Sequence, residues 1–301
     1  MNSATDRAAA DGGYPRISVV TPSFNQGEYL EQAIRSVLDQ NYPDLEYLVI
    51  DGGSTDGSVD IIRRYAGRLA YWCSEPDGGQ YAAINKGFAR STGRIMAWLN
   101  ADDMYFPQAL QTVAAVFTRF PEVAWATSLY PAIWNKAGAV VGVNKRRGFP
   151  RLFFNKGYYA TPRHYFRHHI QQESTFWTRS LWEAAGGLNT AYKLAADFDL
   201  WARFFALAPL AGIRAMLGGF RLHGDQRSVN RQEEYFDEVE HSFRRTGGRH
   251  CRGLDLWFRR SRLAACWPFN VLPSLGIVQP VASIRWDRQA QQWVSVTEYV
   301  D

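Results

Sequence analysis

The stretch RIMAWLNADD at residues 94–103 decides the fold class of this chain. Its apolar first part predicts a buried strand, and that strand continues directly into the adjacent carboxylates of Asp102 and Asp103. Two such carboxylates at a strand end are unfavourable unless a cation lies beside them. Mg²⁺ or Mn²⁺ would meet this need, because a hard divalent ion binds one or two carboxylates together with phosphates. The alternative is a polar turn in which one aspartate caps the helix that Pro107 begins.

Short apolar strands and amphipathic helices alternate around this stretch. We expect strands at residues 16–21, 45–51, 69–75, 93–99 and 123–129, and helices at residues 28–40, 58–66, 80–90 and 107–120. This alternation is typical of βαβ units and predicts an α/β fold around a mostly parallel sheet. Such sheets bind ligands at the carboxyl ends of their strands, and polar turns follow the expected strands there. The turns are TPSFN (21–25), DGGSTDG (51–57), EPDGGQ (75–80) and NADD (100–103).

The alternating pattern is weaker after residue 129. There we expect a β-hairpin at residues 133–143, a helix at 197–208, a strand at 212–223 and a charged helix at 232–245. Beyond residue 251 we expect one amphipathic stretch, at 254–267, and an irregular tail. The small polar residues 1–14 predict a loose N-terminal tail, because they lack the apolar core of a signal peptide.

The composition is that of a folded globular protein, since 46% of the 301 residues are hydrophobic. The net charge of +5 is mild, and we expect no nucleic-acid partner. The segment 123–172, called the basic segment below, contains no acidic residue and many Lys and Arg residues. It is either a solvated face or a surface for phosphates and anionic lipid. Scattered cysteines without CxxC spacing, and no apolar run of membrane-spanning length, favour a cytoplasmic protein.

Seven motifs between Pro15 and Ser228, in this order, resemble those of the family 2 glycosyltransferases of the GT-A fold. They are TPSFN (21–25), DGGSTDG (51–57), the segment 77–87, LNADD (99–103), QQESTFW (171–177), GGLN (186–189) and ADFDLW (196–201). The resemblance implies a Rossmann-like α/β sandwich with a C-terminal acceptor-side subdomain. Its expected parts are a nucleotide-sugar-binding half at 15–128, an acceptor-binding and catalytic half at 129–250, and a C-terminal extension at 251–301.

The resemblance assigns the nucleotide-sugar donor to residues in or near the strand-end turns. These are Pro22, Ser23, Asn25, Asp51, Gly53, Gly79, Gln80, Lys86, Asn100 and Asp102. Asp51 would contact the nucleotide base, although an aspartate there can also hold an Asx-type turn. Lys86 would face a phosphate, although such a lysine is often only exposed to solvent. Asn100 departs from the family pattern, in which aspartate is frequent, and this bears on the ribose contact.

Asp197 matches the general base of the family, which takes the proton of the attacking acceptor hydroxyl. Ala196 precedes it where the family usually has glutamate, so a supporting carboxylate is missing. Asp197 and Asp199 could instead open a helix, because the helix dipole favours acidic residues there. Asp103 is the implied direct ligand of Mn²⁺ or Mg²⁺, with His223 as a second candidate. Further candidate site residues are Gln172, Ser174, Asp199, Gln226 and Ser228.

The resulting hypothesis is an inverting, metal-dependent hexosyltransferase that moves a sugar from a nucleotide sugar, here expected to be UDP-linked, to a hydroxyl of a glycan or lipid-linked acceptor. It would serve polysaccharide biosynthesis of the cell envelope, with the basic segment in peripheral contact with the inner face of the membrane. Two alternatives stay open. A non-catalytic nucleotide-sugar-binding protein is permitted by Asn100 and Ala196. A nucleotidyltransferase is disfavoured, because PSFNQGEYLEQ (22–32) lacks a glycine-rich basic loop.

Overall fold

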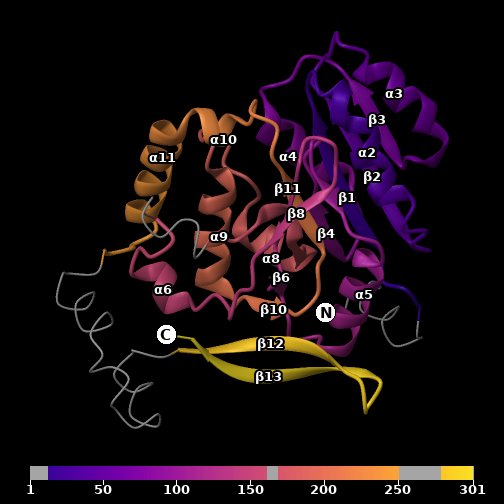
Figure 1. Cartoon of the computed structure of the whole chain (residues 1–301). Coiled ribbons are helices and arrows are strands. Elements are labelled where there is room, and N and C mark those ends of the chain that lie inside the picture. The colour runs from indigo at the N-terminus through magenta and orange to yellow at the C-terminus, as the bar shows by residue number, and fades with distance from the viewer. Residues whose placement is uncertain (1–12, 161–168, 251–278, 301) are drawn as a thin grey trace, which may run out of the picture.

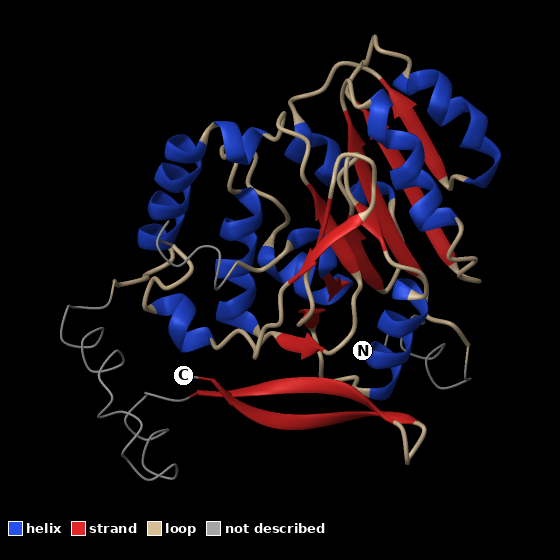
Figure 2. Cartoon of the chain, viewed as in Figure 1, coloured by secondary structure: helices blue, strands red, loops and turns tan. Residues whose placement is uncertain are grey.

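A nine-stranded sheet forms the centre of the computed structural model, which describes residues 13–160, 169–250 and 279–300 (Figures 1 and 2). Its strand order is β13-β12-β10-β6-β9-β4-β1-β2-β3. Parallel pairing joins β3, β2, β1 and β4, and also β6, β10 and β12, whereas β9 and β13 run antiparallel to their neighbours. The strands are β1 (Ile17–Ser23), β2 (Leu45–Asp51), β3 (Tyr71–Ser74), β4 (Ile95–Trp98), β6 (Trp125–Ser128), β9 (Thr175–Thr178), β10 (Ala211–Ile213), β12 (Gln279–Asp287) and β13 (Gln292–Val300). The predicted α/β fold with a mostly parallel sheet is confirmed.

Helices cover both faces of this sheet and give the fold three layers (Figure 2). Successive side chains of β1 point to opposite faces, so Val19 packs in one core with Leu30 of α2 and Val20 in the other with Ile84 of α4. The first core also receives α3 and α5, and the second receives α8, α9 and α11. These helices are α2 (Gly27–Leu38), α3 (Ser58–Tyr65), α4 (Gln80–Arg90), α5 (Ala109–Arg119), α8 (Arg179–Ala185), α9 (Ala196–Leu207) and α11 (Gln232–Arg245).

A smaller sheet lies across the carboxyl edge of β4, with the strand order β5-β11-β7-β8. Its strands are β5 (Met104–Tyr105), β11 (Gly218–Arg221), β7 (Ala132–Trp134) and β8 (Val140–Val143). The antiparallel pair β7 and β8 is the predicted hairpin. The single strand expected at 212–223 is wrong, because the chain turns after Ile213 and its two parts, β10 and β11, join different sheets. Because β5 begins directly after Asp103 and pairs with β11, this sheet fixes the main chain that carries the acidic pair.

The irregular tail expected after residue 267 is also corrected by the structure. Residues 279–300 form the long hairpin β12–β13, which runs along β10 and extends the central sheet (Figure 1). Trp286 and Trp293 face each other across the two strands with their ring centroids 5.6 Å apart. The amphipathic stretch expected at 254–267 and most of the tail expected at 1–14 lie outside the described residues. Within the described ranges, no helix is long and apolar enough to cross a membrane.

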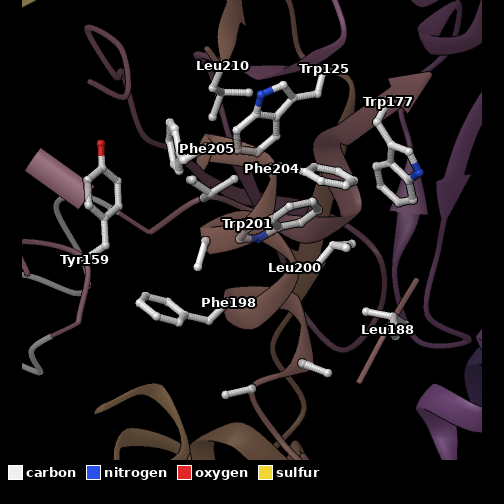
Figure 3. Close-up of a cluster of buried hydrophobic side chains, with 14 of the residues drawn as sticks. Trp125, Tyr159, Trp177, Leu188, Phe198, Leu200, Trp201, Phe204, Phe205 and Leu210 are labelled. Carbon is white, nitrogen blue, oxygen red and sulfur yellow. The ribbon is translucent and has the colours of Figure 1, made fainter. Parts of the chain in front are cut away.

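Aromatic side chains of α9 fill the core beside the candidate site (Figure 3). The Trp201 ring stacks on that of Trp98 at 6.0 Å with an interplanar angle of 5°. Trp201 also stacks on Trp125 at 5.6 Å, and Trp177 packs edge-on against it at 5.8 Å. Short helices and turns complete this region at α6 (Arg151–Asn155), η3 (Gln172–Ser174) and α10 (Arg227–Asn230), while η2 (Ala66–Arg68) extends α3. The first turn of α9, which carries Asp197, is therefore anchored by a rigid core.

Candidate active site

The polar turns predicted at the strand ends meet at one edge of the sheet. The turn after β1 and the turn after β2 are joined by two hydrogen bonds. The Asn25 amide N–H donates to Ser54 Oγ at 2.8 Å, and the Thr55 amide N–H donates to Asn25 Oδ1 at 2.9 Å. Gly53 shapes the turn after β2, because its φ of +85° lies in the left-handed region that favours glycine. Both the main-chain N–H and the side-chain oxygen of Asn25 are therefore bonded to the neighbouring turn.

Asp51 is fully buried and closes the turn after β2. Its carboxylate accepts hydrogen bonds from the Ser54 amide at 2.9 Å, from Ser54 Oγ at 2.6 Å and from Ser74 Oγ at 2.6 Å. The Asx-type turn is thus present. A nucleotide base bound at this site would contact Ser54 and Ser74, which Asp51 orients. A surface hollow of about 640 Å³ borders this turn and β3; its lining includes Ser54, Thr55, Arg63, Trp72 and Ser74.

Ser23 lies directly beside Asp51 in the register of β1 and β2, one residue after the buried Pro22. The Ser23 hydroxyl oxygen is buried and has no hydrogen-bond partner among the described residues. Buried hydroxyls are normally satisfied, so this oxygen is available to a ligand at the strand ends. The structure places Pro22 and Ser23 at the carboxyl end of β1, beside the end of β2.

Asn100 connects the turn after β4 to two other elements. Its Oδ1 accepts a hydrogen bond from Gln80 Nε2 at 2.8 Å, which ties it to the start of α4. Its Nδ2 lies 3.3 Å from Asp103 Oδ2 and 3.3 Å from Gln172 Oε1. An amide can donate and accept at once, whereas an ionised aspartate would only accept. Asn100, which stands where the family frequently has aspartate, therefore forms a hydrogen-bond network that an aspartate could not form.

The two aspartates of the acidic pair have different environments. Asp103 is 1% exposed, and its Oδ1 accepts the main-chain N–H of Arg221 at 2.9 Å. Burial, together with the charges of Asp102 and Glu173, raises the pKa of Asp103. The Asp102 side chain is 20% exposed. The resemblance implies Asp103 as the direct metal ligand, whereas Asp102 is the more exposed of the two carboxylates.

A buried guanidinium lies beneath the acidic pair. Arg221 of β11 is fully buried, and its Nε donates to the main-chain oxygen of Asp102 at 2.6 Å. Its Nη1 donates to Gln32 Oε1 at 2.8 Å, and the guanidinium lies over the Tyr29 ring at 5.1 Å. These contacts hold the turn of the acidic pair against α2. No sequence motif pointed to Arg221, because its role depends on β11 crossing behind residues 102–103.

His223 follows β11 and faces Asp102. Its Nε2 lies 3.1 Å from Asp102 Oδ2, and its ring packs on Tyr29 with centroids 4.6 Å apart. The hydrogen bond to Asp102 raises the pKa of His223. The part of the chain that the structure describes holds no group of three or more His, Cys, Asp or Glu residues able to cage a metal. A carboxylate beside an imidazole fits an ion such as Mn²⁺ that completes its shell with phosphates.

Asp197 lies in the first turn of α9, as the helix-dipole interpretation requires. Its Oδ1 is buried and has no hydrogen-bond partner within the described ranges. Burial is the main cause that raises the pKa of Asp197 to about 6, and the nearby charge of Glu238 adds to it. Such a carboxylate is a stronger base than an exposed aspartate and is ionised at neutral pH. A narrow hollow lies beside it, with a lining that includes Phe154, Tyr159, Phe198, Trp201 and Tyr235.

Glu238 of α11 holds the chain that leads into Asp197. Its carboxylate accepts the main-chain N–H groups of Lys193, Leu194 and Ala195 at 2.8, 2.8 and 2.9 Å. The family glutamate that Ala196 replaces is absent, and Glu238 supplies a carboxylate near the base from another helix. Its place could not be read from the sequence, because α11 begins 35 residues after Asp197.

Asp199 has a structural role in this arrangement. It is fully buried, and it accepts hydrogen bonds from Arg203 Nε at 3.0 Å, from Ser242 Oγ at 2.8 Å and from Arg245 Nη2. Paired on both oxygens, it ties α9 to α11 and is not free for a substrate. The two aspartates of the ADFDLW motif thus differ, since Asp197 keeps an unpaired oxygen and Asp199 does not.

Glu173 is a functional candidate that the sequence did not single out. It lies in η3 between Gln172 and Ser174, is 3% exposed, and its Oε1 has no hydrogen-bond partner among the described residues. Burial is the main cause that raises the pKa of Glu173 to about 8, with further contributions from the charges of Asp102 and Asp197. The only signal in the sequence is the motif QQESTFW, in which the resemblance points to the neighbouring Gln172 and Ser174.

The remaining predicted residues are mostly engaged with the protein itself. Lys86 forms an ion pair with Glu75 after β3, and Gly79, with a φ of +100°, starts α4. Gln226 donates to the main-chain oxygen of Arg221 and accepts from the Gly224 amide. The side chain of Ser228 and residues 161–168 of the basic segment lie outside the described part of the chain.

Three comparisons with known proteins bear on the family and the fold. Residues 18–166 match the family model of Glycosyl transferase family 2. An uncharacterized glycosyltransferase of Mycobacterium tuberculosis is 30% identical over 214 residues, covering 70% of this chain and 76% of the relative. S. aureus TarS 1–349, in complex with UDP-GlcNAc, matches with a TM-score of 0.60 at 15% identity, covering 86% of this chain and 78% of that one. The mannosyltransferase PcManGT from Pyrobaculum calidifontis, in complex with GDP-Man and Mn²⁺, matches with a TM-score of 0.54 at 21% identity, over 76% of this chain and 65% of that one.

Proposed function

The chain belongs to glycosyltransferase family 2 and has the GT-A fold, and on this premise we propose that it is an inverting transferase. It would move a sugar from a nucleotide-sugar donor to a hydroxyl group of a glycan or lipid-linked acceptor. The observation that carries the proposal is the buried Asp197 Oδ1, which has no hydrogen-bond partner in the described structure and stands ready to accept a proton. UDP is our first choice of nucleotide, because TarS, which shares the fold, is described in complex with UDP-GlcNAc.

Residues at the four strand ends would bind the donor. Ser23 offers an unpaired hydroxyl, and Asp51 holds Ser54 and Ser74 toward the nucleotide. Asp102 and His223 would hold a divalent ion, which when bound neutralises the diphosphate and stabilises its charge as the donor bond breaks. Asp103 would support this pair, because its carboxylate already accepts the main-chain N–H of Arg221 and lies 3.3 Å from Asn100 Nδ2. PcManGT is described with Mn²⁺, so Mn²⁺ is the ion to test first.

Asp197 would accept the proton of the acceptor hydroxyl as that oxygen attacks the anomeric carbon. A single displacement from the side opposite the leaving diphosphate inverts the configuration. Glu238 fixes the main chain before the base, and the aromatic core beneath α9 fixes the helix. A base within hydrogen-bond reach of the hydroxyl and with a pKa near 6 suits this step at neutral pH.

We further propose that residues 15–128 supply most of the donor site and residues 129–250 most of the acceptor side, with residues 251–301 as an extension. Residues 145–169 of the basic segment would border the acceptor and contact anionic lipid at the inner face of the membrane from the cytoplasm. Its positive charge suits a lipid-linked acceptor that carries phosphate. A role in polysaccharide assembly at the cell envelope follows from such an acceptor.

Donor binding and turnover test the proposal separately. UDP and UDP-GlcNAc, GDP and GDP-mannose are titrated into the protein by calorimetry with and without Mn²⁺, and donor hydrolysis and transfer are then followed. We expect metal-dependent binding that Asp102→Asn and His223→Ala weaken about tenfold or more, as loss of a ligand does. Asp197→Asn should keep binding and lose turnover. Binding without any turnover on a broad acceptor panel would favour the non-catalytic alternative. Transfer of the nucleotidyl group from a nucleoside triphosphate to an acceptor, with release of pyrophosphate, would favour a nucleotidyltransferase.

A further inference from the structure

Glu173 is a buried carboxyl that the proposed mechanism leaves unused. The residue is 3% exposed, and its Oε1 has no hydrogen-bond partner in the described ranges. A buried carboxyl without a partner is unfavourable for the folded state, so such groups are uncommon outside functional sites. Asp197 Oδ1 is unpartnered in the same way, and it is the proposed base.

The backbone around Glu173 is held rigidly. On one side, Gln172 Nε2 donates to the main-chain oxygen of Trp98 at 2.6 Å. On the other, Ser174 Oγ donates to the main-chain oxygen of Gly218 at 3.0 Å and accepts its N–H at 3.2 Å. η3 is therefore clamped between the end of β4 and the start of β11. The unpaired carboxyl is fixed by the fold and does not lie on a loose loop.

Groups on both sides of the site act on the Glu173 carboxyl. The charges of Asp102, on the metal side, and of Asp197, on the acceptor side, both reach it. In a transfer reaction the anomeric carbon must lie between the diphosphate and the base. The transferred sugar would then lie between the metal side and Asp197. Glu173 would border it, because the neighbouring Gln172 reaches the turn of the acidic pair, with its Oε1 3.3 Å from Asn100 Nδ2.

We propose that Glu173 is a specificity-determining residue that hydrogen-bonds a hydroxyl group of the transferred sugar. The inference rests on the proposed transferase function and names a contact within it. A hydroxyl group satisfies a buried carboxyl in either protonation state, because it can both donate and accept. The contact acts on the sugar and leaves nucleotide recognition to the strand-end turns.

The test compares each nucleotide diphosphate with its sugar conjugate. Wild type, Glu173→Gln and Glu173→Met are titrated by calorimetry with UDP and UDP-GlcNAc and with GDP and GDP-mannose, all in Mn²⁺. We expect both variants to bind the diphosphate as wild type does. Glu173→Met should bind the sugar conjugate about tenfold or more weakly, because removing one partner of a buried hydrogen bond leaves the sugar hydroxyl unsatisfied. Glu173→Gln should lose only part of that factor, because its amide can still form a hydrogen bond. Glu183→Gln is the matched control, since Glu183 is an exposed glutamate of α8.

A merely structural role would give a different result. Replacing an unpartnered buried carboxyl by a neutral side chain of similar size removes an unfavourable group, so both variants should melt at or above the wild-type temperature. The inference would be overturned if the Glu173 variants lost equal affinity for the diphosphate and for its sugar conjugate. It would also be overturned if they bound the conjugate as wild type does, where wild type binds that conjugate more tightly than the diphosphate. If wild type binds none of the nucleotides with Mn²⁺, the proposed function itself fails, and the inference fails with it. Loss confined to the conjugate, in a variant that melts normally, supports both.

Discussion

Lowering the pH should switch off transfer by protonating Asp197 well above the range of an ordinary aspartate. Burial raises the pKa of Asp197 from 3.8 to about 6. By this value about 99% of the base is ionised at pH 8 and about 9% at pH 5, so kcat/KM for the acceptor should fall about tenfold between them. With its ordinary pKa, an aspartate would still be about 94% ionised at pH 5, and the rate would hardly change.

The same shift predicts how stability depends on pH. An acid whose pKa is higher in the folded than in the unfolded state destabilises the fold once it ionises. The penalty is absent below pH 3.8, grows between pH 3.8 and 6, and is complete above 6. It amounts to about 3 kcal/mol at pH 8. Asp197→Asn should therefore raise the free energy of unfolding at pH 8 by up to this amount, and the gain should vanish near pH 4.

The assay is transfer or donor hydrolysis at saturating donor and Mn²⁺ between pH 5 and 8, alongside urea unfolding of wild type and Asp197→Asn. Donor binding by Asp197→Asn across the same range is the control for effects at His223, which is also sensitive to pH. A flat kcat/KM profile down to pH 5 would refute the assignment of the base. Asp197→Asn that is inactive but no more stable at pH 8 would show that the carboxylate is not buried as described.

Three further changes test how the site is held. Glu238→Ala removes the acceptor of three main-chain N–H groups before Asp197. We expect urea unfolding to show a loss of about 2 kcal/mol in the free energy of unfolding. The kcat should fall, while the affinity for the donor should not change. Gly218→Ala would place a Cβ 2.2 Å from the main-chain oxygen of Glu173, so its melting temperature should fall by several degrees, whereas Gly67→Ala, with no neighbouring atom within 4 Å, should not. Deleting residues 279–301 uncovers the edge of β10, and light scattering should then detect aggregation on heating earlier than for the full chain.

Local patterns predicted the first half of the fold well. The helix expected at residues 80–90 is α4 with those bounds, and the strand at 45–51 is β2. For each element, the apolar spacing and the flanking glycine turn lie within about ten residues of each other. Its type and bounds therefore do not depend on a distant contact. The polar turns met at one edge because parallel strands bring their carboxyl ends together.

The C-terminal hairpin shows where local patterns fail. Its reversal has neither glycine nor proline, and instead the Asp287 carboxylate accepts the N–H groups of Gln289 and Ala290 at 2.9 and 3.0 Å. Gln291 then adopts a φ of 48°, which is uncommon for a residue with a side chain. The hairpin that this turn closes is joined to the sheet through β12, which pairs with β10 about seventy residues earlier in the chain. A single sequence does not reveal such a partner.

Site roles were less predictable than site positions, because they depend on burial. Asp102 and Asp103 are equivalent in the sequence, yet β11 covers one and leaves the other reachable. Asp197 and Asp199 share one helical turn, yet Arg203 and Arg245 pair with the second alone. Glu173 stands in a recognised motif, but its meaning comes from the two acidic groups that the fold brings near it.

The distribution of unfavourable groups bears on which function the chain has. A protein that only binds a nucleotide sugar needs the strand-end turns and the metal side, but has no use for a buried base beside the acceptor side. Here Asp197 and Glu173 each keep an unpaired buried oxygen, although Asp199 nearby is fully paired. Replacing either by a neutral side chain would stabilise the fold, so stability does not account for them. Groups that weaken a fold at one place are characteristic of sites where chemistry occurs. The unpaired carboxyl of Asp197 therefore favours a transferase over a binding protein, despite Asn100 and Ala196, whereas Glu173, as a contact to the sugar, suits either.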